Sequence, residues 1–161
     1  MSTQELSTEA VPPAVRAWTR LLRAHASTTR LLSQELQAEH GLTINDYEAL
    51  YLLSRAEGGR MKRVELARKL VLTPSGVTRL LEGLEEAGLV DRAACASDLR
   101  VTYAQLTRSG KERLALASCG HVRSIRALLE EHLSEEEIDT LVETLGKLPD
   151  VAEGDDSCAA V

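Results

Sequence analysis

A short polar and basic stretch in the middle of the chain carries side chains of the kind that contact bases in a DNA major groove. Thr73 precedes Pro74, and this pair combines an N-cap hydroxyl with a proline at the first helical position, so a helix is predicted to begin there. Small side chains on its outward side would bring the backbone close to base edges, and an arginine can donate two hydrogen bonds to guanine. The candidate base-contacting residues are Thr73, Ser75, Gly76, Thr78 and Arg79.

The elements around this stretch are typical of a helix-turn-helix followed by a wing. A short helix is predicted over about 63–70, and a three-residue turn leads from it to the helix that begins after Thr73 and ends at Gly88. Segments 89–93 and 100–106 are compatible with strands and predict a hairpin, whose tip would reach a neighbouring minor groove. The side chains of the two helices that are predicted to face inward are Val64, Leu66, Ala67, Leu70, Val77, Leu80, Leu81 and Leu84.

Basic residues are concentrated around the same stretch. Between Arg60 and Arg113 there are eleven Lys and Arg against seven Asp and Glu, a local charge of +4 in a chain whose net charge is −6. A basic region in an acidic protein is consistent with contacts to phosphate, and random scatter of charges over the surface is the open alternative. The residues predicted to contact phosphates are Lys62, Arg63, Arg68, Lys69, Arg108 and Lys111.

Long helices are predicted on both sides of this lobe. Apolar and semi-apolar residues recur in steps of three and four from Val15 to Leu36, which predicts an amphipathic helix with a seam for a partner helix. Thr43 opens a second helix, and Thr107 caps a long helix after the hairpin. Ser134 and Glu137 form a capping box for a last, apolar helix. The exposed apolar seams predict that these flanking helices mediate dimerisation.

The expected fold class is mainly α, with a winged helix-turn-helix lobe and with N- and C-terminal helices that form a dimerisation region. The chain has 161 residues, is 43% hydrophobic and contains no Phe, so its single core must be built mostly from aliphatic residues. Residues 1–11 and the acidic segment 150–161 are predicted to be disordered. The predicted domain covers 12–149, with dimerisation helices at about 14–40 and 112–148 and the winged lobe at about 43–110.

Composition also indicates a location. No apolar run approaches the length of about 18 to 20 residues that spans a bilayer, and the first ten residues have neither a basic nor an apolar leader region. Three cysteines without a C-x-x-C pair fit a reducing compartment. A cytoplasmic location without a membrane partner is therefore predicted.

Two segments of the chain resemble the MarR (multiple antibiotic resistance regulator) family of bacterial winged-helix transcription factors. Residues 98–100 (Asp-Leu-Arg) and 106–110 (Leu-Thr-Arg-Ser-Gly) are similar to the family's D-x-R…L-T-x-x-G signature, and residues 80–90 resemble the end of its recognition helix. The resemblance covers about 14–148 and implies a homodimer that binds double-stranded DNA at a pseudo-palindromic operator. It also implies release by a small aromatic or phenolic ligand. The expected function is therefore that of a sequence-specific transcriptional regulator acting as a repressor.

The wing departs from the family's pattern. By resemblance, Asp98 orients Arg100 through a charge-assisted pair and Arg100 enters the minor groove, whereas the alternative is that Asp98 only shapes the turn. Family wings usually carry a second arginine beside the first, where this chain has Leu99 and Val101. Minor-groove binding is therefore expected to depend almost entirely on Arg100.

Four side chains are candidate ligand contacts. His25 lies on the seam of the first helix, and with Trp18, Tyr47 and Tyr51 it could line the cleft in which, by resemblance, family members bind their ligands. Aromatic faces and a histidine donor suit a flat aromatic or phenolic anion. The alternative is that these residues are the few large side chains of the core.

Other classes of function have less support. The chain has no Gly-rich phosphate loop, nucleophile elbow or paired carboxylates in an apolar frame, so neither an enzyme nor a cofactor is expected. No two histidines have metal-ligand spacing, so no metal site is expected. Cys95 and Cys119 leave open a redox-responsive regulator of the same fold. A winged-helix adaptor that binds a protein instead of DNA is also open.

Overall fold

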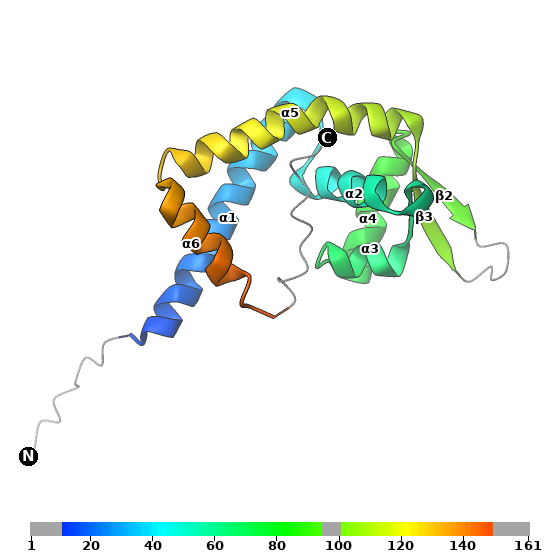
Figure 1. Ribbon diagram of the computed structural model, residues 1–161. Helices are drawn as coiled ribbons and strands as arrows, with labels where there is room; N and C mark the ends of the chain where they lie inside the picture. The colour runs from blue at the N-terminus through cyan, green and yellow to red at the C-terminus, as the bar shows by residue number, and fades with distance from the viewer. Residues whose placement is uncertain (1–10, 95–100, 150–161) are drawn as a thin grey trace, which may run out of the picture.

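The computed structural model of the protein describes residues 11–94 and 101–149. Within these ranges the chain is mainly helical with one small antiparallel sheet, which confirms the predicted mainly α winged helix (Figure 1). No helix in the described part of the chain is long and apolar enough to cross a membrane. The elements in chain order are α1 (Pro13–His40), α2 (Ile44–Arg55), the 3-10 helix η1 (Glu57–Gly59), β1 (Arg60–Lys62), α3 (Arg63–Lys69), α4 (Pro74–Glu86), β2 (Val90–Ala94), β3 (Thr102–Leu106), α5 (Arg108–Glu130) and α6 (Glu135–Leu145).

Side-chain caps determine where several helices begin. At α2, the Thr43 hydroxyl accepts a hydrogen bond from the Asp46 N–H at 3.2 Å, and the Asp46 carboxylate accepts one from the Thr43 N–H at 2.8 Å. Helix α6 begins with the same arrangement at Ser134. At α4, the Thr73 hydroxyl accepts a hydrogen bond from the Gly76 N–H at 3.1 Å. The predicted starts of these helices are confirmed.

The sheet has three strands in the order β1-β3-β2, all antiparallel. Strands β2 and β3 form the predicted hairpin, with Arg92 opposite Ala104. On the other side of β3, Met61 of β1 also lies opposite Ala104. Strand β1 has only three residues, too few for an alternation pattern, and it forms because pairing with β3 satisfies its backbone groups. The lobe therefore has one strand more than the sequence pattern predicts.

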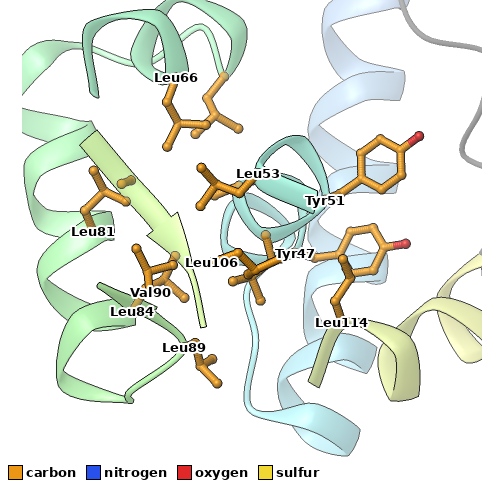
Figure 2. Close-up of a cluster of buried hydrophobic side chains, with 14 of the residues drawn as sticks. Tyr47, Tyr51, Leu53, Leu66, Leu81, Leu84, Leu89, Val90, Leu106 and Leu114 are labelled. Carbon is orange, nitrogen blue, oxygen red and sulfur yellow. The ribbon is translucent and has the colours of Figure 1, made fainter. Parts of the chain in front are cut away.

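The core of the winged lobe lies between α2, α4 and the sheet (Figure 2). The predicted inward face of α4 is confirmed, because Val77, Leu81 and Leu84 are buried and Leu80 packs against the core. The largest fully buried side chains are Leu42, Leu50, Leu53, Leu66, Leu81 and Val90. Helix α4 is thus fixed to the lobe by aliphatic packing along one side, and its other side faces solvent.

The prediction for α3 is partly wrong. Leu66, Ala67 and Leu70 are buried as expected, but Val64 is 83% exposed. Helix α3 has only seven residues, and its buried side begins at Leu66, so the second helical residue points away from the core.

Helix α5 connects the winged lobe to the flanking helices. Figure 1 shows it running from the wing strands over the lobe toward α1, with α6 beyond its far end. It packs against the C-terminal half of α1 and against α2. Several large apolar side chains of the flanking helices are exposed. They are Val15, Trp18, Leu22 and Leu31 on α1, Leu141 and Val142 on α6, and Leu148 just after α6.

The turn between α3 and α4 contains a strained residue. Val71 has a φ of +53°, and no other non-glycine residue in 11–94 and 101–149 has a positive φ. The left-handed region costs a non-glycine residue about 1–2 kcal/mol, because its Cβ crowds the backbone. Val71 is 90% exposed, so packing does not offset this cost.

Replacing Val71 with glycine is expected to raise the free energy of unfolding by about 1 kcal/mol, because glycine adopts this φ without strain. The matched control is V64G, which places glycine in a helix and should lower the free energy of unfolding by about 0.5 kcal/mol. Urea unfolding of both variants measures the two changes. A loss of stability in both would contradict the assignment of strain to Val71.

Candidate nucleic-acid interface

The first two turns of α4 present small hydroxyl side chains that are held by local hydrogen bonds. The Thr73 hydroxyl, which caps the helix through the Gly76 N–H, lies 3.2 Å from the Ser75 hydroxyl. The Thr78 hydroxyl donates to the Pro74 carbonyl at 2.8 Å, which leaves its oxygen lone pairs available as acceptors. A methyl group at Gly76 would lie 3.2 Å from the Thr73 hydroxyl oxygen, so glycine keeps this turn tight. The predicted residues therefore form one preorganised polar surface.

Arg79 lies on the same exposed side of α4, one turn after Ser75. Its side chain has no hydrogen bond or ion pair with any residue in the described ranges. Arg108 and Arg126, by contrast, pair with Glu112 and Glu130 at 2.9 and 3.0 Å. Arg79 is therefore free to donate both of its terminal nitrogens to an external acceptor such as guanine.

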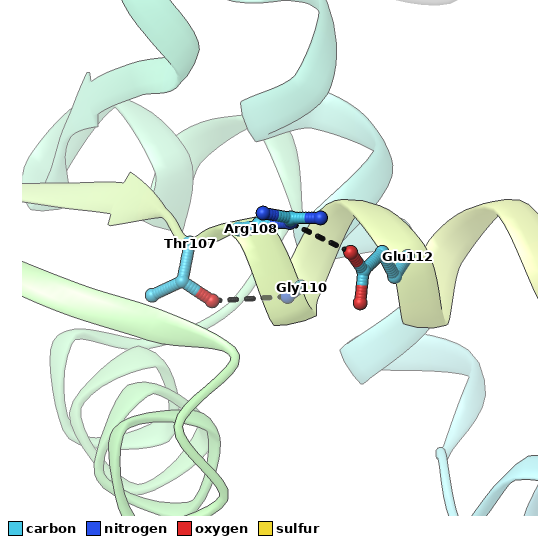
Figure 3. Close-up of polar contacts among 4 residues, drawn as sticks. All are labelled: Thr107, Arg108, Gly110 and Glu112. Carbon is cyan, nitrogen blue, oxygen red and sulfur yellow. Dashed lines mark hydrogen bonds and ion pairs between the residues drawn. The ribbon is translucent and has the colours of Figure 1, made fainter.

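The Thr107 hydroxyl ties the start of α5 to the end of α4. It accepts a hydrogen bond from the Gly110 N–H at 2.9 Å (Figure 3). It also donates one to the Gly88 carbonyl at 2.8 Å. The Thr107 N–H also donates to the Leu89 carbonyl at 3.1 Å. The L-T-x-x-G segment is thus a structural joint that holds the recognition helix.

Gly110 allows the first turn of α5 to approach the backbone at Leu89 closely. A Cβ at this position would overlap the carbonyl oxygen of Leu89 and lie 2.7 Å from the Cδ1 atom of Leu106. The first turn of α5 can therefore pack directly on the backbone between α4 and β2 only because residue 110 has no side chain.

The residues predicted to contact phosphates differ in accessibility. Lys62, Arg68, Lys69 and Lys111 are exposed, whereas Arg63 is half-buried and its Nη2 is buried without a hydrogen-bond partner among the described residues. Arg108 is exposed and forms an i,i+4 ion pair with Glu112. Because such a surface pair is weak, a phosphate could replace Glu112 as the partner of Arg108. The lysines and Arg68 are therefore better placed for phosphate than Arg63.

The tip of the wing lies outside the described residues, and Cys95, Asp98 and Arg100 fall within it. The strands that lead to it are described. Arg92 of β2 pairs with Glu85 of α4 at 3.4 Å, which links the wing to the recognition helix.

The four candidate ligand residues are not gathered into one enclosed pocket. Tyr47 and Tyr51 are buried on α2, whereas Trp18 is 60% exposed and His25 is exposed on α1. Neither of two surface depressions, of about 10 and 490 Å³, is lined by any of the four. Tyr47 instead points toward α5, beside Leu114 (Figure 2). Its hydroxyl donates to the Ser118 hydroxyl of α5 at 3.2 Å.

Two groups that were not among the predicted site residues lie close to them. Burial raises the pKa of the Glu48 carboxyl, and the nearby His25 opposes this effect, so α1 and α2 place an acid and a base together. The ring of His121 on α5 lies against the Tyr47 ring in a tilted arrangement, with an interplanar angle of 59°. The detectable signal for His121 is its place in the stripe Leu114, Ala117, Ser118, His121. No group of three or more His, Cys, Asp or Glu in 11–94 and 101–149 is arranged to hold a metal ion.

A capped helix with exposed polar side chains, together with the helix and turn before it and the hairpin after it, defines a winged helix-turn-helix DNA-binding protein. Comparison with known proteins agrees. A family model described as the MarR family matches residues 40–100. The crystal structure of AbsC, a MarR family transcriptional regulator from Streptomyces coelicolor, is 34% identical, with a TM-score of 0.75 over 86% of this chain and 93% of that one.

Two further relatives extend the comparison. Sco3205, a MarR family transcriptional regulator from Streptomyces coelicolor solved in complex with DNA, is 30% identical, with a TM-score of 0.74 and 80% coverage of both chains. The transcriptional repressor YetL of Bacillus subtilis is 37% identical over 111 residues, which are 69% of this chain and 66% of that protein. The chain belongs to the MarR family of transcriptional regulators.

Proposed function

We propose that the protein is a homodimeric repressor that binds a pseudo-palindromic operator and releases it when a small aromatic or phenolic molecule binds. The observation that carries the DNA-binding part is the exposed surface of α4, where Arg79 has no partner among the described residues and the Ser75 and Thr78 hydroxyls are held in place. The DNA complex of Sco3205 and the description of YetL as a repressor support the proposal. Deletion of the gene tests it, because transcripts of the regulated genes should then rise, whereas an activator would give the opposite change.

In this proposal α4 enters the major groove and the wing enters the adjacent minor groove. Ser75, Thr78 and Arg79 would contact base edges, with Thr73 and Gly76 fixing the turn that presents them. Arg100, oriented by Asp98, would be the main minor-groove contact. The phosphate contacts would come from Lys62, Arg68, Lys69 and Lys111, with smaller contributions from Arg63 and Arg108.

The proposed dimer uses the apolar surfaces of α1 and α6. Trp18 and Val142 are 60% and 62% exposed, which is a large exposure for such side chains in a single chain. A second copy would cover them and would place two recognition helices about one DNA turn, or roughly 34 Å, apart.

Sedimentation at micromolar concentration is expected to give twice the 17.5 kDa mass of one chain. The variant L22D should shift the protein toward monomer, because it places a charge in the apolar seam of α1. The control K111D changes an exposed residue outside that seam and should leave the mass unchanged. A clean monomer for the unmodified chain would contradict the proposed dimer.

The effector site is proposed to lie between α1, α2 and the winged lobe, near Trp18, His25, Tyr47 and Tyr51. A ligand that tilts one lobe spoils the spacing of the two recognition helices, and a tenfold loss of operator affinity requires about 1.4 kcal/mol of preference for the misfit conformation.

Calorimetry with salicylate-like compounds is expected to show binding that W18A and H25A weaken. The variant H132A is the control, because His132 is exposed at the end of α5 and its Nδ1 atom contacts only the Leu128 carbonyl in the described structure. Absence of binding at millimolar ligand, or equal binding by all variants, would remove this site.

A further inference from the structure

His121 is a buried histidine at the contact between α5 and the winged lobe. It is 7% exposed, and its Nδ1 atom has no hydrogen-bond partner among the described residues. Its ring lies against the ring of Tyr47 on α2, with 4.4 Å between the ring centroids. The Tyr47 hydroxyl donates to Ser118, which lies one turn before His121 on α5, at 3.2 Å. These contacts join α5 to the first helix of the lobe.

The surroundings of His121 favour its neutral form. Burial lowers the pKa of the His121 imidazole, and the carboxylate of Glu35 on α1 opposes this effect. The cavity beside the ring measures about 10 Å³, room for one water molecule and too small for an organic ligand. The titratable, charged and polar groups around His121 are Glu35, Glu39 and His40 of α1, Tyr47 of α2, and Ser118 and Ser124 of α5.

Protonation changes what this contact requires. A neutral imidazole has one donor nitrogen, whereas an imidazolium donates from both. The Nδ1 atom has no acceptor among the described residues, so the charged ring is better solvated in a conformation in which it leaves Tyr47 and reaches water. A proton therefore favours opening of the contact between α5 and α2.

We propose that the contact of His121 with Tyr47 is a proton-sensitive joint, and that mild acid opens it, loosens the winged lobe and weakens DNA binding. The inference rests on the proposed function, since DNA affinity is its biological readout. A lobe held at a fixed angle to α5 is already ordered for the operator, whereas a loosened lobe must be ordered again when it binds.

The direction and size of the effect follow from linkage. Because the pKa is lowered in the folded protein, stability is complete above the unfolded value of about 6.5 and is lost as the pH falls below it. An open state with an ordinary histidine pKa therefore gains population as the pH falls, by at most about tenfold at pH 5.5, one unit below that value. We therefore expect DNA affinity to fall between pH 7.5 and 5.5, by at most about tenfold, because the apparent affinity scales with the fraction of the protein in which the contact is closed.

The test uses the full chain and two non-titrating variants, H121Q and H121F, of which H121F retains a ring against Tyr47. DNA affinity at pH 7.5 and 5.5 is measured by fluorescence anisotropy, and urea unfolding is measured at the same two values. The wild-type protein should lose affinity and stability in acid, and whichever variant folds should lose less of both. H132Q, which changes an exposed histidine, should behave like the wild-type protein.

An NMR titration of His121 separates this inference from the proposed function. If no duplex is bound at pH 7.5, the proposed function fails. The titration and the unfolding data then still show whether the contact of His121 with Tyr47 is sensitive to protonation. A His121 pKa at or above 6.5 would contradict the proposal that protonation of His121 opens its contact with Tyr47. The same acid sensitivity in the wild-type protein and the folded variant would also contradict it.

Discussion

Replacing Gly110 with alanine is expected to lower the free energy of unfolding by about 3 kcal/mol, at the upper end of the usual cost of overpacking. The added methyl group would overlap the Leu89 carbonyl oxygen and lie 2.7 Å from Leu106 Cδ1. The backbone carbonyl cannot move without breaking its hydrogen bond with the Thr107 N–H, so α5 would have to shift away from the lobe. Urea unfolding followed by circular dichroism measures the change.

Gly83 provides a matched control for this substitution. It lies inside α4, and a Cβ there would meet no atom within 4 Å. The variant G83A should therefore raise the free energy of unfolding by about 0.5–1 kcal/mol, through helix propensity alone. If G110A unfolded at the same denaturant concentration as the parent, the close approach at the start of α5 would not exist.

Replacing Arg79 with alanine is expected to weaken operator binding by about 1–3 kcal/mol, or roughly 5- to 150-fold, and to relax the base preference at the position it contacts. The reason is that its guanidinium has no partner among the described residues and lies on the exposed side of the recognition helix. The variant R79K should recover only part of the loss, because an ammonium group cannot match guanine with two parallel hydrogen bonds.

The control for Arg79 is R126A, which removes an arginine of α5 that pairs with Glu130 on the protein surface. Its operator affinity should equal that of the parent at fixed salt. Binding isotherms with the cognate duplex and with single-base variants measure both affinity and preference. An R79A protein that keeps the parent's affinity and base preference would exclude Arg79 from base contact.

Helix starts and the core side of α4 could be predicted from the sequence because their causes are local. Thr43, Thr73, Thr107 and Ser134 each cap a helix through a residue three positions later. The apolar spacing of α4 likewise marks the buried side that the structure confirms.

Features that depend on distant residues could not be predicted in the same way. Strand β1 exists only through pairing with β3, more than forty positions later in the chain. The partner of Tyr47 is Ser118, 71 positions away, so the contact of Tyr47 with α5 could not be read from the local sequence. Val71 adopts a left-handed conformation that glycine usually adopts, so neither its residue type nor its neighbours in the sequence predict this strained φ.

Selection of duplexes from a random-sequence library, with the full chain at about 150 mM salt, tests the central claim most directly. We predict enrichment of an inverted repeat whose half-site centres lie about 10 base pairs apart, as two recognition helices of one dimer require. Affinity for the selected duplex should fall steeply between about 50 and 200 mM salt because phosphate contacts release counterions. A library that stays random after repeated rounds would contradict sequence-specific DNA binding by this protein.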